Sequence, residues 1–484
     1  MGLLDSGRLP PIRALVDDYL KGVRSPVAVI EEQLSLAEKL NPHLNAFVTI
    51  SHERARVAAE MAHDSYQGRG PVGRLSGVPV TVKDNIQTQD IRTTFGSSRF
   101  RDNIPTGDAV CVARLVSAGA VLIGKSATPE FACRQTTSSP VSGISRNPLD
   151  PKLTPGGSSG GGAAATAAGI GAVAIVTDGG GSARLPAACT ALSGFKPTLG
   201  RIPFETANDG FGGFAHIGLM AKHVTDVREA FAVMEGPHRD DPWSSHNENR
   251  QILRAGGLRP LQGVRVGWRM RLGDEPIDAE VERCFHSRRD QLQELGASLV
   301  PLLDEIEAPL PIWRKLQDTI WSVRYGNSFS ASGSLDPVIN SGIERANRME
   351  ARELQIANQG RTRLFRTVQH WFETCDVIVT PTLTRPPIAA DHPGFGEIEI
   401  CGRPAGDIRQ AWAPFLGLFT MTGHPAISLN AGWTEHSSLP IGLHFVGPWR
   451  SDYAILDFAE QLEASFGATV DLRPPVTQQK KGTE

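Results

Sequence analysis

Three short segments of the sequence hold the residue types that acyl transfer needs. Lys83 closes the apolar part of GVPVTVKDN, Ser158 and Ser159 lie in GGSSGGGAAA, and Ser182 follows three glycines in TDGGGSARLPA. A serine hydroxyl is a weak nucleophile without a base, and a lysine acts as a base only when it is neutral. Burial among the valines of its segment would disfavour the charged form and lower the pKa of Lys83. The three segments together therefore indicate covalent catalysis.

These segments resemble the amidase signature family. The likeness rests on Lys83, GGSSGG, TDGGGSARLPA and GFKPT (194–198). It extends to AGAVLIGKSATPEFA (118–132), RNP (146–148), DVIVTPT (376–382), GHPAISL (423–429) and LPIGLHFVGP (439–448). The resemblance implies a Ser-Ser-Lys triad in which Ser182 is the nucleophile, Ser158 the bridging serine and Lys83 the base. It also implies a cis peptide bond between Gly157 and Ser158, and a supporting hydrogen bond from Ser159.

The glycines before Ser182 fit an oxyanion hole. Backbone N–H groups stabilise the tetrahedral oxyanion of acyl transfer, and glycine lets them converge without a Cβ clash. The resemblance assigns these donors to Gly179, Gly180, Gly181 and Ser182. Many family members carry a bulkier residue at the first position, so Gly179 is expected to loosen the loop or enlarge the pocket. Asp178 and Arg184 are expected to brace the loop as a salt bridge.

The expected substrate is a small-molecule amide with an aryl or hydrophobic group. The Gly- and Phe-rich segment FETANDGFGGFAHIG (204–218) could line an apolar pocket. The predicted pocket residues are Phe131, Ala132, Cys133 and Phe211. A carbamate hydrolase with the same triad is an alternative. A glutaminase-type subunit of a tRNA-dependent amidotransferase is another, although residues 342–365 do not match the glutamine-binding pattern that such subunits usually carry there.

Three motifs from other enzyme classes also occur. GAVLIGKS (119–126) matches a phosphate-binding P-loop and supports a nucleotide hydrolase as a further alternative, but its apolar residues favour a buried strand. GIGAVA (169–174) fits a dinucleotide fingerprint in the wrong order of helix and strand. GGSSG (156–160) matches a nucleophile elbow, but the proline-rich segment before it disfavours the required strand. His216, His223 and His424 are expected to be packing or surface histidines. His424 differs from the other two because it lies in an apolar stretch flanked by Gly423 and Pro425.

The composition is that of an ordinary globular protein. The 484 residues carry a net charge of −3, with 40% hydrophobic and 21% charged residues. That charge gives no reason to expect nucleic acid or a membrane as a partner. The six scattered cysteines form no CxxC pair, so we expect no metal site and a reducing, cytoplasmic location. The triad needs no cofactor, and a homodimer remains open.

Alternating helix and strand patterns predict the scaffold that positions these residues. We expect a single α/β domain in which helices cover both faces of a large mixed twisted sheet, with the site near residues 156–184. Residues 1–70 are expected to form a helical segment packed on a core of residues 71–484, with a disordered tail at 476–484. Strands are predicted in 77–85, 119–126, 172–178, 263–268 and 375–382, and helices from Pro26, from about Ile277, and from about Gly342 to Glu373.

Overall fold

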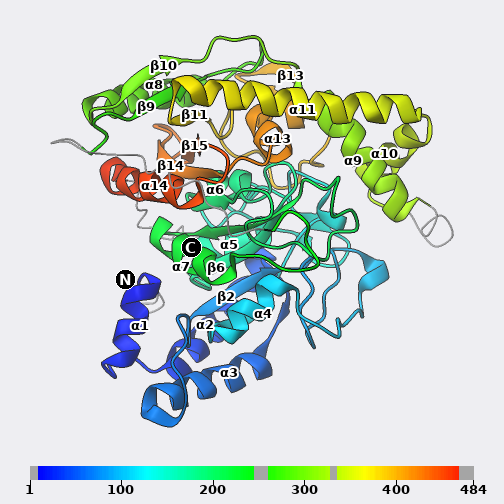
Figure 1. The fold of residues 1–484 in the computed structure, drawn as a ribbon. Coiled ribbons are helices and arrows are strands. Elements are labelled where there is room, and N and C mark those ends of the chain that lie inside the picture. The colour runs from blue at the N-terminus through cyan, green and yellow to red at the C-terminus, as the bar shows by residue number, and fades with distance from the viewer. Residues whose placement is uncertain (1–8, 245–259, 327–334, 468–484) are drawn as a thin grey trace, which may run out of the picture.

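A computed structural model of the protein describes residues 9–244, 260–326 and 335–467. A large mixed sheet runs through the structure (Figure 1). The sheet has eleven strands. In spatial order they are β1 (Phe47–Ile50), β3 (Val121–Ser126), β2 (Pro79–Lys83), β6 (Val173–Asp178), β8 (His216–Ala221), β7 (Ser193–Lys196), β14 (Ala426–Trp433), β15 (Pro440–Val446), β11 (Val377–Pro381), β9 (Arg265–Trp268) and β10 (Ser298–Pro301). Two small hairpins, β4 (Ser138–Ser139) with β5 (Gly143–Ile144) and β12 (Glu397–Ile400) with β13 (Arg403–Asp407), lie outside it.

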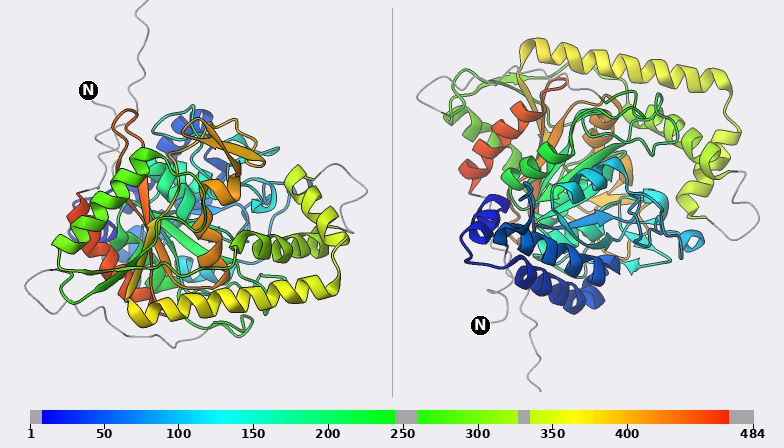
Figure 2. Two further views of the ribbon diagram at one scale, coloured as in Figure 1. Left: turned by 90° about the horizontal axis from the view of Figure 1, so that it is seen from above. Right: turned by 60° about the horizontal axis from the view of Figure 1, so that its bottom comes forward.

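Fourteen α-helices surround the sheet within the described residues. They are α1 (Ile12–Leu20), α2 (Pro26–Leu44), α3 (His52–Asp64), α4 (Val110–Ser117), α5 (Gly160–Ala167), α6 (Arg184–Thr190), α7 (Val224–Met234), α8 (Ala279–Glu294), α9 (Pro309–Tyr325), α10 (Pro337–Asn347), α11 (Ala351–Thr374), α12 (Ile408–Trp412), α13 (Pro414–Met421) and α14 (Asp452–Phe466). Figure 1 shows α1 to α4 at one end of the molecule and α8 and α11 at the other. In both views of Figure 2, α11 lies on the outside.

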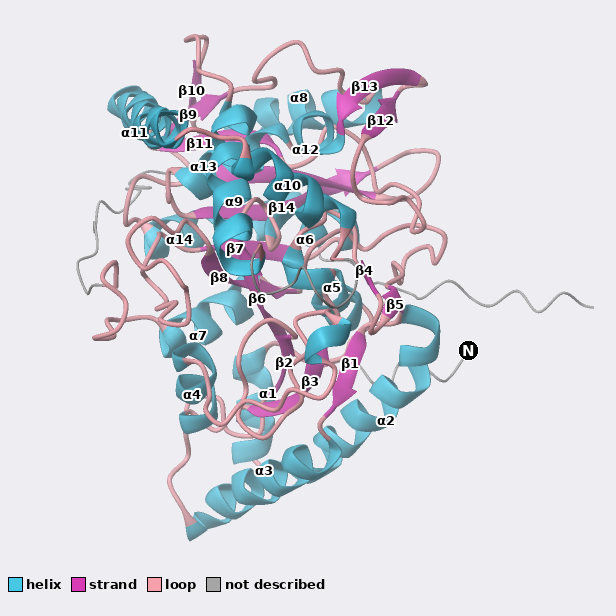
Figure 3. Ribbon diagram, turned by 90° about the vertical axis from the view of Figure 1, so that its right-hand side faces the viewer, coloured by secondary structure: helices cyan, strands magenta, loops and turns pink. Residues whose placement is uncertain are grey.

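The strands at the centre of the sheet are buried on both faces. Successive residues of β6 point to opposite sides, so Val173 and Ile175 join a core with α4, α7, α8 and α14, whereas Ala174 and Val176 join a core with α5 and α6. Figure 3 shows the strands stacked between these helices. The expected fold, a single α/β domain with helices on both faces of a mixed sheet, is confirmed.

The parallel strands β3, β2 and β6 run side by side, so their carboxyl ends lie at one edge of the sheet. Lys83 ends β2, and Thr177 and Asp178 end β6. The first turn of helix α5 packs tightly against the chain at Ala127. A Cβ on Gly161 would lie 2.3 Å from the backbone nitrogen of Ala127. Glycine is needed there so that the helix can approach the sheet edge.

Several details differ from the sequence-based expectations. The stretch 119–126 contains the fully buried strand β3, so it forms no phosphate-binding loop and the P-loop alternative is wrong. The helix expected from Gly342 to Glu373 is two helices, because a capping box between Glu350 and Glu353 starts α11 anew. The N-terminal segment also contributes β1, which pairs with β3 at the sheet edge. The tail at 476–484 lies outside the described residues.

Candidate active site

Lys83 lies at the buried centre of the candidate site. Its side chain is fully buried at the end of β2. Its Nζ donates to Ser158 Oγ at 2.7 Å and to Thr177 Oγ1 at 3.0 Å. Burial lowers the pKa of Lys83 from 10.5 to about 7, although the nearby carboxylate of Asp178 acts in the opposite direction. A substantial fraction of Lys83 is therefore neutral near pH 7.

Two serine hydroxyls extend this hydrogen-bonded chain toward solvent. Ser158 lies between Lys83 and Ser182, and its Oγ donates to Ser182 Oγ at 2.9 Å. The Gly157–Ser158 peptide bond is cis, as the resemblance implies. Because each hydroxyl can both donate and accept, the chain can reverse and carry a proton from Ser182 to a neutral Lys83. The neighbouring Ser159 Oγ instead donates to the Thr177 carbonyl oxygen at 3.4 Å.

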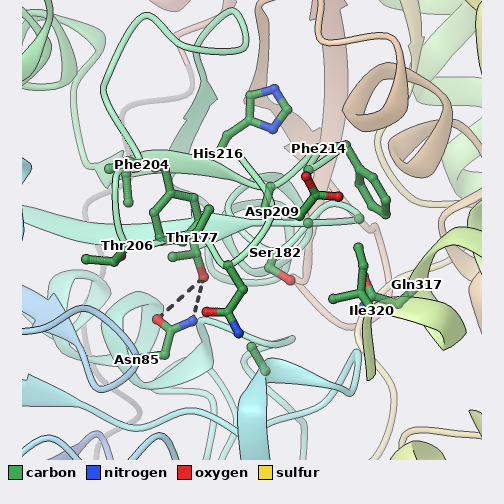
Figure 4. Close-up of a pocket in the computed structure, with 18 of the residues that line it drawn as sticks. Asn85, Thr177, Ser182, Phe204, Thr206, Asp209, Phe214, His216, Gln317 and Ile320 are labelled. Carbon is green, nitrogen blue, oxygen red and sulfur yellow. Dashed lines mark hydrogen bonds between the residues drawn. The ribbon is translucent and has the colours of Figure 1, made fainter. Parts of the chain in front are cut away.

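Thr177 and Asn85 are polar residues of the site that the sequence analysis missed. Thr177 Oγ1 accepts from Lys83 and also from Asn85 Nδ2 at 3.0 Å. Both residues line the cavity beside Ser182, as Figure 4 shows. They lie within segments already singled out, since Asn85 follows Lys83 by two residues and Thr177 precedes Asp178. Threonine and asparagine at these positions could have been recognised as polar groups at strand ends.

A buried ion pair between Asp178 and Arg184 holds the loop before Ser182 in place. Asp178 and Arg184 are both fully buried and form a salt bridge of 2.9 Å, as expected. Burial alone would raise the pKa of Asp178, but the charge and hydrogen bonds of Arg184 outweigh it and hold that pKa below its usual range. Asp178 also accepts from the backbone N–H groups of Gly181 at 2.7 Å and Ala183 at 3.2 Å. The pair thus fixes the backbone on both sides of the serine.

The three glycines serve different purposes. Gly181 has φ of +115° and its Cβ would lie 2.6 Å from Leu416, so only glycine fits. Because the N–H of Gly181 is bonded to Asp178, it differs from those of Gly180 and Ser182, which have no intramolecular acceptor among the described residues. A Cβ on Gly179 would approach only Ala215, at 3.9 Å, so glycine leaves open space there.

Trp313 of α9 contacts this loop from the far part of the sequence. Its Nε1 donates to the Gly179 carbonyl oxygen at 2.8 Å. Because a peptide unit is planar, this bond also orients the N–H of Gly180. Trp313 could not be predicted from the sequence, because neither its neighbours nor its spacing marks it and only the packing of α9 brings it to the loop.

A cavity of about 350 Å³ opens beside Ser182. Its wall is rich in aromatic side chains, namely Phe95, Phe131, Phe204, Phe214, Trp243, Trp313, Trp321 and Tyr325. Figure 4 shows Ser182 among the lining residues, with Gln317 and Ile320 of α9 on one side. Of the predicted pocket residues, Phe131 and Ala132 line the cavity, whereas Cys133 and Phe211 do not. Cys133 is buried in an apolar cluster, and Phe211 is 78% exposed on the loop outside.

The candidate histidines are packing or surface residues. His216 lines the cavity, but its ring points away from Ser182 and its Nδ1 lies 3.4 Å from the Asp178 carbonyl oxygen. His424 is fully buried against Phe365, Phe372 and Trp449. His223 flanks α7 and lies 4.0 Å from Glu463. None of the three has a hydrogen bond to a serine of the site within the described residues.

The part of the chain that the structure describes contains no group of three or more His, Cys, Asp or Glu placed to hold a metal ion. Within those same residues, none of the helices combines the length and apolar character needed to cross a bilayer.

Comparison with known proteins extends the likeness over most of the chain. The Amidase family model matches residues 28–456. An acylamidase of Rhodococcus erythropolis is 31% identical over 91% of this chain and 92% of its own length. One component of the glutamyl-tRNA(Gln) amidotransferase of Symbiobacterium thermophilum is 32% identical over 91% of this chain and 93% of its own length.

Solved structures share the fold. The structure of a bacterial aryl acylamidase superimposes with a TM-score of 0.86 at 24% identity, covering 97% of this chain and 99% of the other. At that identity the likeness establishes the fold alone. The family match, the relatives and the shared fold together show that this chain belongs to the amidase family and is an amide-hydrolysing enzyme.

Proposed function

We propose that the protein hydrolyses amides through an acyl-enzyme on Ser182, with Lys83 as base and Ser158 as the proton carrier between them. The observation that carries this proposal is the continuous hydrogen-bonded chain from Lys83 Nζ to Ser158 Oγ (2.7 Å) and on to Ser182 Oγ (2.9 Å). Only Ser182 of these three residues follows the glycine loop, so it is the group that meets the substrate carbonyl.

The proton movements balance through one acylation and one deacylation. Neutral Lys83 takes the proton of Ser158 while Ser158 takes that of Ser182, and Ser182 Oγ attacks the carbonyl carbon. When the C–N bond breaks, Ser158 gives its proton to the departing nitrogen and recovers one from Lys83. Water then gives a proton to the same relay as its oxygen attacks the acyl carbon. When the bond from that carbon to Ser182 Oγ breaks, the relay returns the proton to Ser182 Oγ and the carboxylic acid leaves.

The proposed oxyanion donors are the N–H groups of Gly180 and Ser182, with Gly179 beside them. Their lack of an intramolecular acceptor among the described residues supports this role, since a polar group committed to the fold could not bind the oxyanion. The bond between Gly181 and Asp178 supports a different role for Gly181, which is to hold the loop in place. Losing one oxyanion donor typically costs about 3 kcal/mol of transition-state stabilisation.

The proposed substrates are amides with an aryl or other apolar group. The aromatic wall of the cavity supports this class, because rings pack on flat apolar groups with good area burial. The acylamidase of Rhodococcus erythropolis among the relatives supports an acyl amide as the substrate. A carbamate would fit the same relay, since its carbonyl is attacked in the same manner.

A glutaminase-type component of an amidotransferase is the second candidate, supported by the amidotransferase component found among the relatives. It would require a protein partner and a polar pocket for glutamine. The aromatic cavity favours a stand-alone enzyme on small molecules without nucleic acid, monomeric or homodimeric. All six cysteines are free thiols, which supports a reducing compartment such as the cytoplasm.

The experiment that tests the proposal compares two substrates with the same acyl group, a primary amide and an anilide, and uses Ser182→Ala as the blank. Anilide turnover that disappears in Ser182→Ala supports an aryl-amide hydrolase. Turnover of the primary amide alone favours a small-amide or glutaminase-type enzyme. Activity that survives in Ser182→Ala would overturn the assignment of the nucleophile.

A further inference from the structure

A second cavity, of about 220 Å³, adjoins the cavity beside Ser182. Four residues line both cavities: Gln135, Gly180, Trp313 and Arg409. Gly180 belongs to the loop before Ser182, and Trp313 is bonded to that loop through the Gly179 carbonyl. The wall between the cavities therefore stands directly beside the reacting groups, and its polar side chains are those of Arg409 and Gln135.

The Arg409 guanidinium has few hydrogen-bond acceptors and no carboxylate partner among the described residues. Its guanidinium carbon lies 4.5 Å from the centre of the Trp313 ring, and its Nη2 donates to the Cys133 carbonyl oxygen. No other acceptor bonds this guanidinium among the described residues. Arg114 likewise has no carboxylate partner among the described residues. Its guanidinium, however, donates to four backbone carbonyl oxygens. A guanidinium has five N–H donors, so most of those of Arg409 are unused.

The carboxylates around Arg409 are already bound to other arginines. Asp407 pairs with Arg314 at 2.6 Å. Asp318 pairs with Arg345 at 2.7 Å, and Asp336 pairs with Arg134 at 2.6 Å. Burial lowers the pKa of Arg409, but the ordinary value is so high that the group keeps its charge. Arg409 is half-buried and its unused donors belong to a side chain that lines both cavities, so an incoming anion would be stabilised there.

Gln135 provides an independent sign of a missing ligand. Its side chain is 4% exposed, and its Oε1 is buried without a hydrogen-bond partner among the described residues. Buried polar atoms are usually satisfied, and an unsatisfied one costs about 1–3 kcal/mol. Because Gln135 lines the same two cavities as Arg409, a polar ligand at this wall could bond to both side chains.

We propose that Arg409, assisted by Gln135, binds a carboxylate of the substrate, so that the enzyme selects amides that carry an anionic group as well as an apolar one. This inference rests on the proposed acyl transfer at Ser182 and names its substrate class more closely. A carboxylate matches the planar fork of a guanidinium and can accept two parallel hydrogen bonds. The Gln135 NH2 group can donate to the same anion, and its Oε1 can accept from an N–H of the substrate.

The first test compares charged and neutral substrates in two matched series. In one, the carboxylate is on the acyl part, as in the monoanilide of glutaric acid against pentananilide. In the other it is on the amine part, as in N-butyryl-4-aminobenzoate against butyranilide. Arg409→Met should lower the ratio of kcat/KM between charged and neutral substrates roughly 10- to 100-fold in one series, and Arg409→Lys should restore part of it. The responding series identifies the part of the substrate that carries the anion.

Arg385→Met is the matched control. Arg385 is also half-buried, has no carboxylate partner among the described residues and donates to the Glu399 carbonyl oxygen, but it lines neither cavity. Its replacement should leave the ratio unchanged. Ratios that are unchanged in both series for Arg409→Met would overturn the proposal, while loss of turnover in Ser182→Ala would still uphold the acyl-enzyme.

A binding measurement separates this proposal from catalysis. Calorimetry of glutarate and 4-aminobenzoate with Ser182→Ala needs no turnover, so it remains informative even if Ser182 is not the nucleophile. Adding Arg409→Met to Ser182→Ala should weaken binding of at least one anion tenfold or more. Equal dissociation constants for both proteins, with unchanged unfolding temperatures, would overturn the carboxylate site.

Discussion

Lys83 is the last residue of β2, and Lys125 is the second-last residue of the neighbouring parallel strand β3. They belong to β2 and β3, which pair so that Val82 lies opposite Lys125. Both side chains are fully buried, and burial lowers the pKa of each to about 7. Their partners differ. Lys83 donates to two hydroxyls, one of which leads to Ser182, whereas Lys125 donates to the Ile86 carbonyl oxygen and to Thr88 Oγ1.

This difference shows that a lowered pKa does not by itself make a lysine a catalytic base. A lysine with a lowered pKa can take a proton only from a group that has one to give. The Ser158 hydroxyl is bonded to Ser182 and can pass on its proton. The Thr88 hydroxyl is bonded, among the described residues, only to Lys125 and to the Ile86 carbonyl oxygen, which has no proton to give. Lys125 instead ties the turn at residues 86–88 to the strand end, and that turn follows Asn85 of the site. We therefore expect Lys83 to take part in the reaction and Lys125 to stabilise the fold.

The largest effect should come from removing the hydroxyl at the end of the Lys83 relay. Ser182→Ala leaves no nucleophile, so kcat/KM for an anilide should fall about 10,000-fold or more. The unfolding temperature should change little, because only one hydroxyl is lost. Steady-state kinetics with a thermal melt checks both, and turnover within tenfold of wild type would contradict the assignment.

Matched substitutions of the two lysines should separate them. Lys83→Met removes the base and should lower kcat/KM about 1,000-fold without loss of stability, since Ser158 and Thr177 keep Ser182 and Asn85 as partners. Lys125→Met should keep activity within a few-fold but lower the free energy of unfolding by about 1–3 kcal/mol, because Thr88 Oγ1 loses its donor and the buried Ile86 carbonyl oxygen keeps, among the described residues, only the 3.2 Å bond from Thr88. Chemical denaturation and kinetics on both variants test the contrast. Equal losses of activity in the two variants would contradict it.

The pH dependence should follow Lys83 alone. The active form is the neutral amine, and protonation removes it, so kcat/KM should fall as the pH drops below the pKa of about 7. The decrease should approach tenfold per pH unit on the acid side. Lys125→Met should leave this limb in place, because Lys125 does not touch the relay. A profile that stays flat from about pH 8 to about pH 5 would show that Lys83 is not the base.

A smaller effect is expected from the loop support. Trp313→Phe keeps most of the ring packing but removes the donor to the Gly179 carbonyl oxygen. The Gly180 N–H should then be less well aimed, so kcat should fall roughly 3- to 30-fold with little change in KM. The same substitution should not move the acid limb of the pH profile. A higher KM with an unchanged kcat would instead indicate that Trp313 only shapes the pocket.

The sequence predicted those parts of the site that depend on residues close together in the chain. The strand ending at Lys83, the ion pair of Asp178 with Arg184 and the glycine loop all follow from local patterns. Residues supplied by distant helices could not be found in that way. Trp313 of α9 reaches the loop, and Arg409 of α12 lies over the Trp313 ring, only through the packing of these helices, which no spacing in the sequence records.

The same limit explains the wrong pocket residues. Cys133 directly follows Phe131 and Ala132, but the chain turns there through two residues with positive φ and buries the thiol in the apolar cluster. Phe211 belongs to a segment in which Phe204 and Phe214 line the cavity, yet its own ring is exposed. A composition rich in Phe and Gly can indicate that a segment borders a cavity, but the direction of each side chain depends on the backbone at that residue.

The most direct test of the account is covalent labelling with phenylmethanesulfonyl fluoride, in which a serine oxygen displaces fluoride from sulfur. Mass spectrometry would locate the adduct, and its rate would be followed from about pH 5 to about pH 9 in wild type, Lys83→Met and Lys125→Met. We predict an adduct on Ser182 whose rate rises with pH through about 7 in wild type and Lys125→Met. The rate should be lost in Lys83→Met. An adduct on another residue, or equal rates in all three proteins, would contradict a Ser182 nucleophile activated by Lys83.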